Sequence, residues 1–252
     1  MSNETAVALD ASWAIAERPH GGYLLRLLAE AALDSEHSDP LAVSAHFLSP
    51  PQPGTATICT ERLRRGRRVS TTRCQLVEDG ELRVEALVTS GRLPAHEAPR
   101  FAAPALPPIP PPLDLPRAPS SSPGSPFHVG HLDHVDLRMD PETSGWALGA
   151  PAGRAEYRAW MRRDDAEAAS PLDLIVFADA MPPTTFDLGM AGWVPTVELT
   201  VLLRGRPAPG WVLVRQRSAL VSDGWLDEEC DIWDSTGRLV AQARQLASYR
   251  ES

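Results

Sequence analysis

The sequence predicts an α+β fold made of two copies of one unit, in which a helix packs on an antiparallel sheet. A helical pattern followed by four strand-like runs occurs twice along the chain. Turn sequences recur at matching places: Pro51-Gln52-Pro53-Gly54 is echoed by Pro207-Ala208-Pro209-Gly210, and Gly80-Glu81-Leu82 by Gly237-Arg238-Leu239. The offsets are 156 residues between positions 51 and 207 and 157 between positions 80 and 237. An internal repeat explains the length better than two unrelated domains do.

The composition fits one large domain or two small ones. The chain has 252 residues, of which 43% are hydrophobic, and this is enough for a substantial core. The formal net charge of -9 argues against a nucleic-acid partner, because phosphate binding needs a basic face. Residues 1–10 lack the features of a secretory signal, and no apolar run is long enough to cross a bilayer. We therefore expect a cytoplasmic protein. Its cysteines lack paired spacing and are expected to be reduced thiols that serve packing: Cys59, Cys74 and Cys230.

Residues 1–93 hold the first copy. A strand is expected over residues 12–16 and a helix over residues 23–33, and Gly21 and Gly22 allow another backbone to approach the start of this helix. The apolar residues that share one face of the predicted helix are Leu24, Leu27, Leu28 and Ala31. The four strand-like runs that follow are 41–48, 55–62, 68–77 and 82–92, with Asp79-Gly80 as a tight turn between the last two. His20 is expected to hold the loop that enters the helix, rather than to act in catalysis.

Five arginines surround one glycine in the turn Glu61-Arg62-Leu63-Arg64-Arg65-Gly66-Arg67-Arg68. Guanidinium groups hold phosphates through charge-assisted hydrogen bonds, so Arg65, Arg67 and Arg68 are candidate substrate contacts. The alternative is a solvated hairpin tip.

Residues 94–126 contain about half of the chain's 25 prolines and are predicted to form a stiff, extended linker. The second copy follows over residues 127–252. A strand predicted over residues 127–139 carries three histidines and two aspartates. Alternation would place His128, His134 and Asp136 on one face and the other two on the opposite face, so no metal site is expected there. The later strand-like runs are 146–161, 194–203, 211–221, 226–233 and 239–249.

The segment Ser170 to Pro183 is predicted to be the helix of the second copy. Ser170 suits its N-cap, with Pro171 at the first position and a carboxylate three residues after the cap. The helical spacing places Asp179 on the buried face, in the last turn, where burial and the helix dipole both raise the pKa of a carboxylate. This cost suggests a functional role. The alternative is that Asp179 binds backbone groups near Pro182-Pro183.

Two further polar residues occupy unexpected places in the second copy. Gln245 shares a strand face with small apolar residues, and its equivalent in the first copy by offset is Val88. Thr196 is a weaker candidate, which alternation places on the same face as Glu198. Asp179 also has no acidic equivalent in the first copy, where the same offset leads to Tyr23. A single polar site built mainly from the second copy is therefore expected.

Several segments of the chain together resemble the acyl-CoA thioesterase II family of double hotdog proteins. The resemblance covers nearly the whole chain and rests on the two-copy layout and on the order and spacing of the arginine hairpin 61–68, Phe177-Ala178-Asp179, Val194-Pro195-Thr196 and the strand 240–245. It implies a double hotdog, in which two helix-on-sheet units in one chain imitate a hotdog dimer.

The same resemblance implies hydrolysis of acyl-CoA thioesters. In that family an Asp, a Thr and a Gln position and activate a water molecule, and these roles fall on Asp179, Thr196 and Gln245. Gly21 and Gly22 join the arginines as candidate substrate-binding residues. No metal or redox cofactor is implied.

Other functions stay open at this stage. A non-catalytic acyl-CoA or lipid-binding protein is the main alternative. Enoyl thioester hydration ranks lower, because no Asp is followed five residues later by His on the central helix. An open sheet also permits pairing with a second copy of the chain, so a homo-oligomer is possible.

Overall fold

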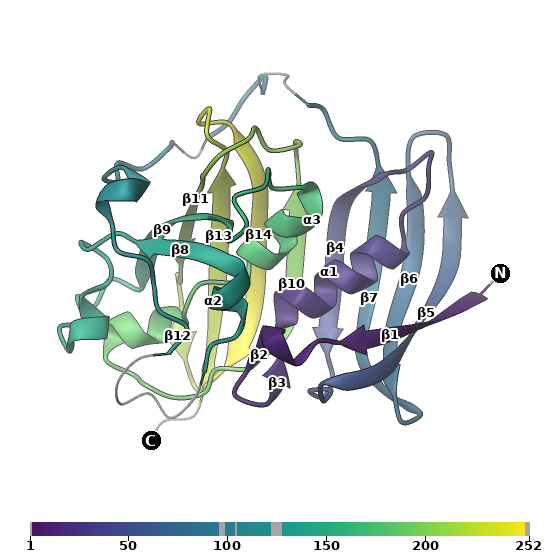
Figure 1. The fold of residues 1–252 in the computed structure, drawn as a ribbon, viewed down its shortest axis with the longest axis horizontal. Coiled ribbons are helices and arrows are strands. Elements are labelled where there is room, and N and C mark those ends of the chain that lie inside the picture. The colour runs from purple at the N-terminus through teal and green to yellow at the C-terminus, as the bar shows by residue number, and fades with distance from the viewer. Residues whose placement is uncertain (1, 96–98, 104, 122–127, 250–252) are drawn as a thin grey trace.

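The computed structural model describes residues 2–95, 99–103, 105–121 and 128–249. Twelve strands of these residues belong to one antiparallel sheet, whose main path runs β1-β5-β6-β7-β4-β10-β14-β13-β11-β9-β8. The helices α1 (Gly21–Ala31) and α3 (Pro171–Phe177) lie side by side on one face of the sheet (Figure 1). This arrangement confirms the predicted α+β fold.

The two halves follow the same plan. In the first half the strands after α1 are β4 (Asp39–Phe47), β5 (Gly54–Arg65), β6 (Ser70–Glu78) and β7 (Glu81–Gly91). In the second half those after α3 are β10 (Thr196–Leu203), β11 (Val212–Arg217), β13 (Trp225–Trp233) and β14 (Leu239–Ser248), with the short β12 (Val221–Ser222) beside β13. Each set is hydrogen-bonded in the same spatial order, with its first strand next to its fourth. The repeat predicted from the sequence is thus present in the fold.

The two halves are joined through their equivalent strands. β4 pairs antiparallel with β10, and Val43 lies opposite Val201 while Ser44 lies opposite Thr200. The valines are fully buried under the helices, and the two hydroxyls hydrogen-bond at 2.8 Å. Successive residues of a strand point to opposite faces, so this register separates the helix-covered face from the outer face across the junction.

The outer strands differ between the halves. Ser2–Leu9 forms β1, which pairs with β5, although no strand was predicted there from the sequence. The strand expected at 12–16 is instead a short 3₁₀ turn, Ala11–Trp13, followed by β2 (Ala14–Ile15), which pairs with β3 (Arg18–Pro19). The second half ends in β9 (Glu156–Arg163) and β8 (Val135–Met139). The expected strand 146–161 starts late, since Gly145–Leu148 is a 3₁₀ turn.

The strand predicted over 127–139 is also interrupted. Residue 127 lies outside the described residues, and His131–His134 forms the helical turn α2 before β8 begins. The predicted distribution of these histidines over the two faces of one strand is therefore wrong. Among the described residues, no group of three or more His, Cys, Asp or Glu side chains is arranged to hold a metal ion. Likewise, no helix within the described ranges is long and apolar enough to cross a membrane.

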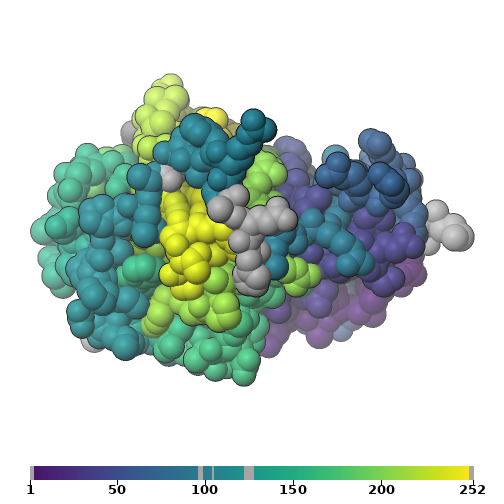
Figure 2. Space-filling view, turned by 90° about the horizontal axis from the view of Figure 1, so that it is seen from above, coloured from purple at the N-terminus to yellow at the C-terminus, as the bar shows by residue number. Residues whose placement is uncertain are grey.

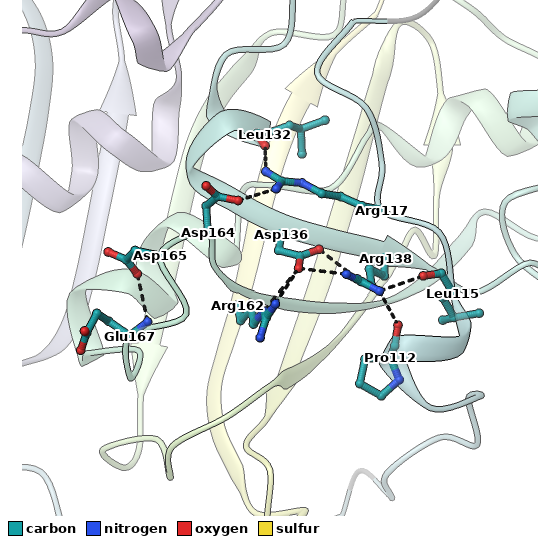
Figure 3. A network of polar contacts seen from close by, with 10 residues as sticks. All are labelled: Pro112, Leu115, Arg117, Leu132, Asp136, Arg138, Arg162, Asp164, Asp165 and Glu167. Carbon is teal, nitrogen blue, oxygen red and sulfur yellow. Dashed lines mark hydrogen bonds and ion pairs between the residues drawn. The ribbon is translucent and has the colours of Figure 1, made fainter.

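The proline-rich segment crosses the second half (Figure 2). Arg138 of β8 donates hydrogen bonds to the carbonyl oxygens of Pro112 and Leu115 and also contacts the carboxylate of Asp136, which Arg162 of β9 shares (Figure 3). The indole of Trp160 donates to the Pro110 carbonyl at 2.9 Å. These contacts hold the described part of the segment on β8 and β9.

The buried face of α1 is rotated relative to the predicted one. Leu24, Leu25 and Leu28 are buried, whereas Leu27 is half-buried and Ala31 is exposed. The helix also begins at Gly21, two residues earlier than expected. The reason is that α1 packs against α3 as well as against the sheet, so two flanks of the helix need apolar residues.

We predict that Leu28→Ala lowers the free energy of unfolding by about 2–5 kcal/mol, because Leu28 is fully enclosed and truncation leaves a cavity. Leu27→Ala is the matched control and should cost clearly less, since its side chain is only half-buried. Urea unfolding of both variants measures the difference. Equal losses would contradict the observed orientation of α1.

Candidate active site

Asp179 lies just beyond the end of α3. Ser170 and Asp173 form the predicted capping box, in which the Ser170 N–H donates to Asp173 Oδ2 at 2.8 Å and the Asp173 N–H donates to Ser170 Oγ at 3.3 Å. The helix ends at Phe177, and the Asp179 N–H still donates to the Val176 carbonyl at 3.1 Å. The prediction that Asp179 lies in the last turn of the helix is therefore wrong, because Asp179 follows directly after the helix end.

The Asp179 carboxylate is largely buried and is bonded to the start of α1. Its side chain is 11% exposed, and Oδ2 accepts the Gly22 N–H at 2.7 Å. Burial raises the pKa of Asp179, while His20 and the Gly22 N–H act in the opposite direction. The position at a helix N-terminus also favours a negative charge. The side chain thus bonds a backbone group, as the structural alternative proposed, but one from the other copy.

His20 holds this junction together. It is the N-cap of α1, and its Nδ1 accepts the Tyr23 N–H at 3.3 Å. Because Nδ1 is an acceptor, Nε2 carries the proton, which it donates to the Asp179 carbonyl oxygen at 2.8 Å. The same nitrogen lies 3.4 Å from Asp179 Oδ2. His20 therefore holds the loop entering the helix, as predicted, and in addition secures the segment that carries Asp179.

A second histidine supports the same segment. His131 packs on His20 with ring centroids 4.4 Å apart, and its Nε2 lies 3.1 Å from the Ala180 carbonyl oxygen. Burial lowers the pKa of His131, so the ring is neutral and acts as a hydrogen-bonding and packing group. Two imidazoles thus hold the carbonyl groups of consecutive residues.

Gly21 and Gly22 allow a close approach at the start of α1, as predicted from the sequence, and the approaching segment is α3 with Asp179. A Cβ atom on Gly21 would lie 2.8 Å from Asp179 Oδ2, and one on Gly22 would lie 3.1 Å from the Val176 backbone. Any side chain at these positions would push against α3 or against the Asp179 carboxylate.

Thr196 and Gln245 are brought into direct contact. The Thr196 hydroxyl donates to Gln245 Oε1 at 3.0 Å. A β-bulge makes this contact possible: Thr196 lies opposite Ala247 and Leu199 lies opposite Gln245, so the strand has one extra residue, Val197. Thr196 therefore shares the helix-covered face with Leu199 and Gln245.

Because of this bulge, the predicted position of Glu198 is wrong. Glu198 does not share a face with Thr196; it points to the outer face, where it accepts the Thr200 hydroxyl at 2.6 Å and lies opposite His46. Simple alternation could not show this, because a bulge has no signature in the pattern of apolar residues.

Glu228 is a further polar residue of the site, which the sequence reasoning missed. It lies opposite Gln245 in the neighbouring strand, is only 3% exposed, and accepts hydrogen bonds from Gln245 Nε2 and, at 2.7 Å, from the Thr184 N–H. Burial raises the pKa of Glu228. A signal was available, since Leu226, Cys230 and Ile232 share its strand face and are apolar.

Asp179 lies at the same end of the central strands as the hydrogen-bonded side chains of Thr196, Gln245 and Glu228. A Cβ on Gly21 would touch both Asp179 and the Phe47 ring, and Phe47 follows His46, which pairs with Glu198 near the start of β10. Burial raises the pKa of the Cys230 thiol, and the carboxylates of Asp231, Glu228 and Asp179 act in the same direction. The candidate site therefore gathers Asp179, Thr196, Gln245 and Glu228.

The arginine hairpin lies elsewhere. Arg65 pairs with Glu36 at 2.8 Å and Arg62 pairs with Asp34 at 3.0 Å, both in the loop after α1. Arg67 and Arg68 are exposed at the hairpin tip. Because the 11 residues of α1 span about 16 Å, the hairpin is a helix length away from Gly21 and Gly22. The structure does not bring the arginines to Asp179.

A polar cavity of about 170 Å³ also lies apart from this group. It is lined by residues that include Trp13, Arg26, Asp173 and Phe177. None of Asp179, Thr196, Gln245 or Glu228 lines it.

Two adjacent helices on one continuous antiparallel sheet, with the unit repeated within the chain, define a double hotdog fold. Solved structures with a similar fold include the following three. A candidate thioesterase II from Thermobifida fusca has a TM-score of 0.87 at 36% identity, and the match covers 99% of this chain and 93% of that one. A hot dog protein of unknown function from Alicyclobacillus acidocaldarius has a TM-score of 0.86 at 21% identity, and the match covers 99% of this chain and 94% of that one. An acyl-CoA thioesterase II from Mycobacterium marinum has a TM-score of 0.69 at 20% identity, and the match covers 99% of this chain and 94% of that one.

The chain belongs to the acyl-CoA thioesterase family. Its N-terminal domain model matches residues 9–91 and its C-terminal domain model matches residues 106–249. Uncharacterized proteins from Mycobacterium tuberculosis and Mycobacterium bovis are 33% identical over 95% of this chain and 88% of theirs. The C-terminal match begins within the proline-rich segment, and the division at residues 93, 94–126 and 127 stays a prediction.

We predict that Gly22→Ala destabilises the protein by about 1–3 kcal/mol, because the new methyl group presses on the α3 backbone at Val176. Gly21→Ala should cost less stability, since its methyl group meets the end of a side chain, Asp179 Oδ2. Thermal and urea unfolding of the two variants check this order. A neutral effect of Gly22→Ala would show that the helices are not in such close contact.

Proposed function

We propose that this protein hydrolyses acyl-CoA thioesters with a water molecule that Asp179 activates and that Thr196 and Gln245 position. Membership of the acyl-CoA thioesterase family supports a thioesterase. The observation that carries the finer proposal is the buried carboxylate of Asp179, held at the N-terminus of α1 on the same end of the sheet as the Thr196–Gln245 pair. A cytoplasmic location belongs to the same proposal.

Asp179 acts as the general base. It takes a proton from water while the water oxygen bonds to the thioester carbonyl carbon. Collapse of the tetrahedral intermediate breaks the carbon–sulfur bond, and the proton passes to the leaving thiolate. The raised pKa of Asp179 suits this task, because it brings the carboxylate closer to the pH at which it both accepts and returns a proton.

The start of α1 receives the carbonyl oxygen. The first N–H groups of a helix have no acceptor within the helix. Here the Gly22 N–H bonds Asp179 and the Tyr23 N–H bonds His20. Within the described residues no acceptor is found for the Gly21 N–H, which can therefore polarise the thioester carbonyl. Gly21 is thus proposed to bind the substrate through this role, and Gly22 supports it by holding Asp179.

The arginines act at the far end of the substrate in this proposal. Arg65, Arg67 and Arg68 are kept as candidate contacts for the coenzyme A phosphates, because all three are exposed and no acidic partner of Arg67 or Arg68 occurs among the described residues. Their distance from Asp179 is consistent with the separation between phosphates and thioester along an extended carrier.

We predict that Asp179→Asn abolishes thioester hydrolysis, with a loss of at least about 100-fold in kcat, because the amide cannot accept the proton. The variant should also be more stable at neutral pH. Burial raises the pKa of Asp179 above its unfolded value, so the charged form destabilises the folded protein at pH values above that raised pKa, and the amide removes this cost.

Thiol release from a panel of short, medium, long and aromatic acyl-CoA esters measures the activity, and thermal unfolding measures the stability. Glu198→Gln is the matched control: it neutralises an acid of β10 on the outer face and should keep full activity. Full activity of Asp179→Asn would remove Asp179 from the mechanism. Ligand binding without any hydrolysis by the wild type would indicate the non-catalytic acyl-CoA-binding alternative.

The pH dependence gives an independent prediction. A general base works only when it is deprotonated, so kcat/KM should rise with pH through an apparent pKa above the usual aspartate value of about 3.9. Initial rates with a saturable acyl-CoA ester between about pH 4 and pH 8 test this, with circular dichroism to verify folding at each pH. A flat profile over that range would argue against Asp179 as the base.

A further inference from the structure

Glu228, Gln245 and Thr196 form a chain of side chains whose hydrogen bonds run in one direction. The Thr196 hydroxyl donates to Gln245 Oε1, and Gln245 Nε2 donates to Glu228 Oε2. Glu228 lies beneath the other two, being only 3% exposed, whereas Thr196 and Gln245 are half-buried. The buried end of the chain is thus a carboxylate, and the accessible end is a hydroxyl.

The direction of the chain is fixed by Glu228. A carboxylate only accepts hydrogen bonds, and the Thr184 N–H, which only donates, occupies the other oxygen at 2.7 Å. Burial raises the pKa of Glu228, while Thr184, Gln245 and Gln216 act in the opposite direction; Gln216 Nε2 itself donates to the Pro182 carbonyl oxygen at 3.4 Å. Oε1 of Glu228 is therefore held as an acceptor, and the Gln245 amide turns its NH₂ group toward Oε2. The amide carbonyl then faces Thr196.

This direction determines what Thr196 offers to the site. Because its single proton is donated to Gln245, only the lone pairs of its Oγ1 remain for a water molecule. A water that donates one hydrogen to Thr196 and the other to Asp179 keeps its own lone pair free for attack on a carbonyl carbon. If the amide were reversed, Gln245 would donate to Thr196, and the Thr196 hydroxyl would instead bind the lone pair that must attack.

The first copy supports this interpretation by contrast. Glu228 lies opposite Gln245 in the sheet, and in the first copy Thr72 lies opposite Val88, the equivalent of Gln245. Where the amide is absent, the buried acid is absent too. Thr72 is buried, as Glu228 is, but it cannot provide a carboxylate.

We propose that Glu228 is a positioning residue that fixes the amide of Gln245 and thereby makes Thr196 an acceptor for the attacking water. This inference rests on the proposed thioesterase function. Glu228 itself does not touch the reacting atoms; it acts through Gln245.

Glu228→Gln tests the proposal, because it keeps the size of the side chain and places an NH₂ group where only an acceptor stood. The Gln245 amide can then reverse. We expect kcat to fall by at least about tenfold with KM changed by less than about twofold, since water orientation is lost and acyl-CoA binding is kept. Glu78→Gln is the control, a buried glutamate of the first copy that binds Arg83 and the Gln52 N–H far from Gln245. It should leave both constants unchanged.

A double-mutant cycle separates positioning from stability. In a Gln245→Ala background, Glu228→Gln should cause no further loss of kcat, because the group through which Glu228 acts is gone. An equal loss in both backgrounds would overturn the proposal. Glu228→Asp, which keeps an acceptor, should retain more activity than Glu228→Gln.

A measurement on the unaltered protein does not depend on activity or on the folding of a variant. In protein labelled with ¹⁵N-glutamine, the Gln245 side-chain amide should exchange slowly with solvent, because one N–H is donated to a buried carboxylate. Exchange at the rate of a free amide would overturn the role of Glu228. Slow exchange in a protein that hydrolyses no acyl-CoA ester would keep the hydrogen-bond chain and reject the thioesterase function instead.

Discussion

The hydrogen bond between the Gly22 N–H and the Asp179 carboxylate is the contact on which the site depends. It joins the start of one helix to the end of the other, and it exists only because Gly21 and Gly22 leave room for α3 to approach. His20 and His131 support the same junction from the side by holding the carbonyl groups of Asp179 and Ala180. Among the described residues no Arg or Lys forms a salt bridge with Asp179, so the buried acid stays basic enough for the proton transfer proposed for it.

The two halves share one framework but not one chemistry. The sheet order, the helix position and the β4–β10 junction are repeated about a local two-fold relation. Asp179, Gln245 and Glu228 occur only in the second half, while the first half contributes the glycines and His20 that receive the acid. The candidate site is therefore shared: one copy supplies the polar side chains, and the other supplies the helix terminus that binds Asp179.

Much of this could be predicted from the sequence, because it depends on local patterns. The repeat appears in turn sequences at constant offsets, the capping box of α3 appears in Ser170 and Asp173, and Gln245 stands out on an apolar strand face. Other features depend on tertiary context. The bulge at Val197 changes the face of Thr196 and cannot be seen in alternation, and the rotation of α1 follows from its contact with α3. Glu228 could have been found, since its neighbours on the strand face are apolar. The partner of His20 could not, because it lies 159 residues away.

The covalent connection between the halves has a consequence for how such a site can change. When two identical chains assemble, every substitution appears twice, and the assembly separates on dilution. Here both halves lie in one chain, and the described part of the proline-rich segment between them is bonded to β8 and β9, so their association does not depend on protein concentration. A substitution alters one half alone. Tandem fusion thus frees one unit to keep a polar, destabilising candidate site while the other is selected only for packing and for its helix terminus.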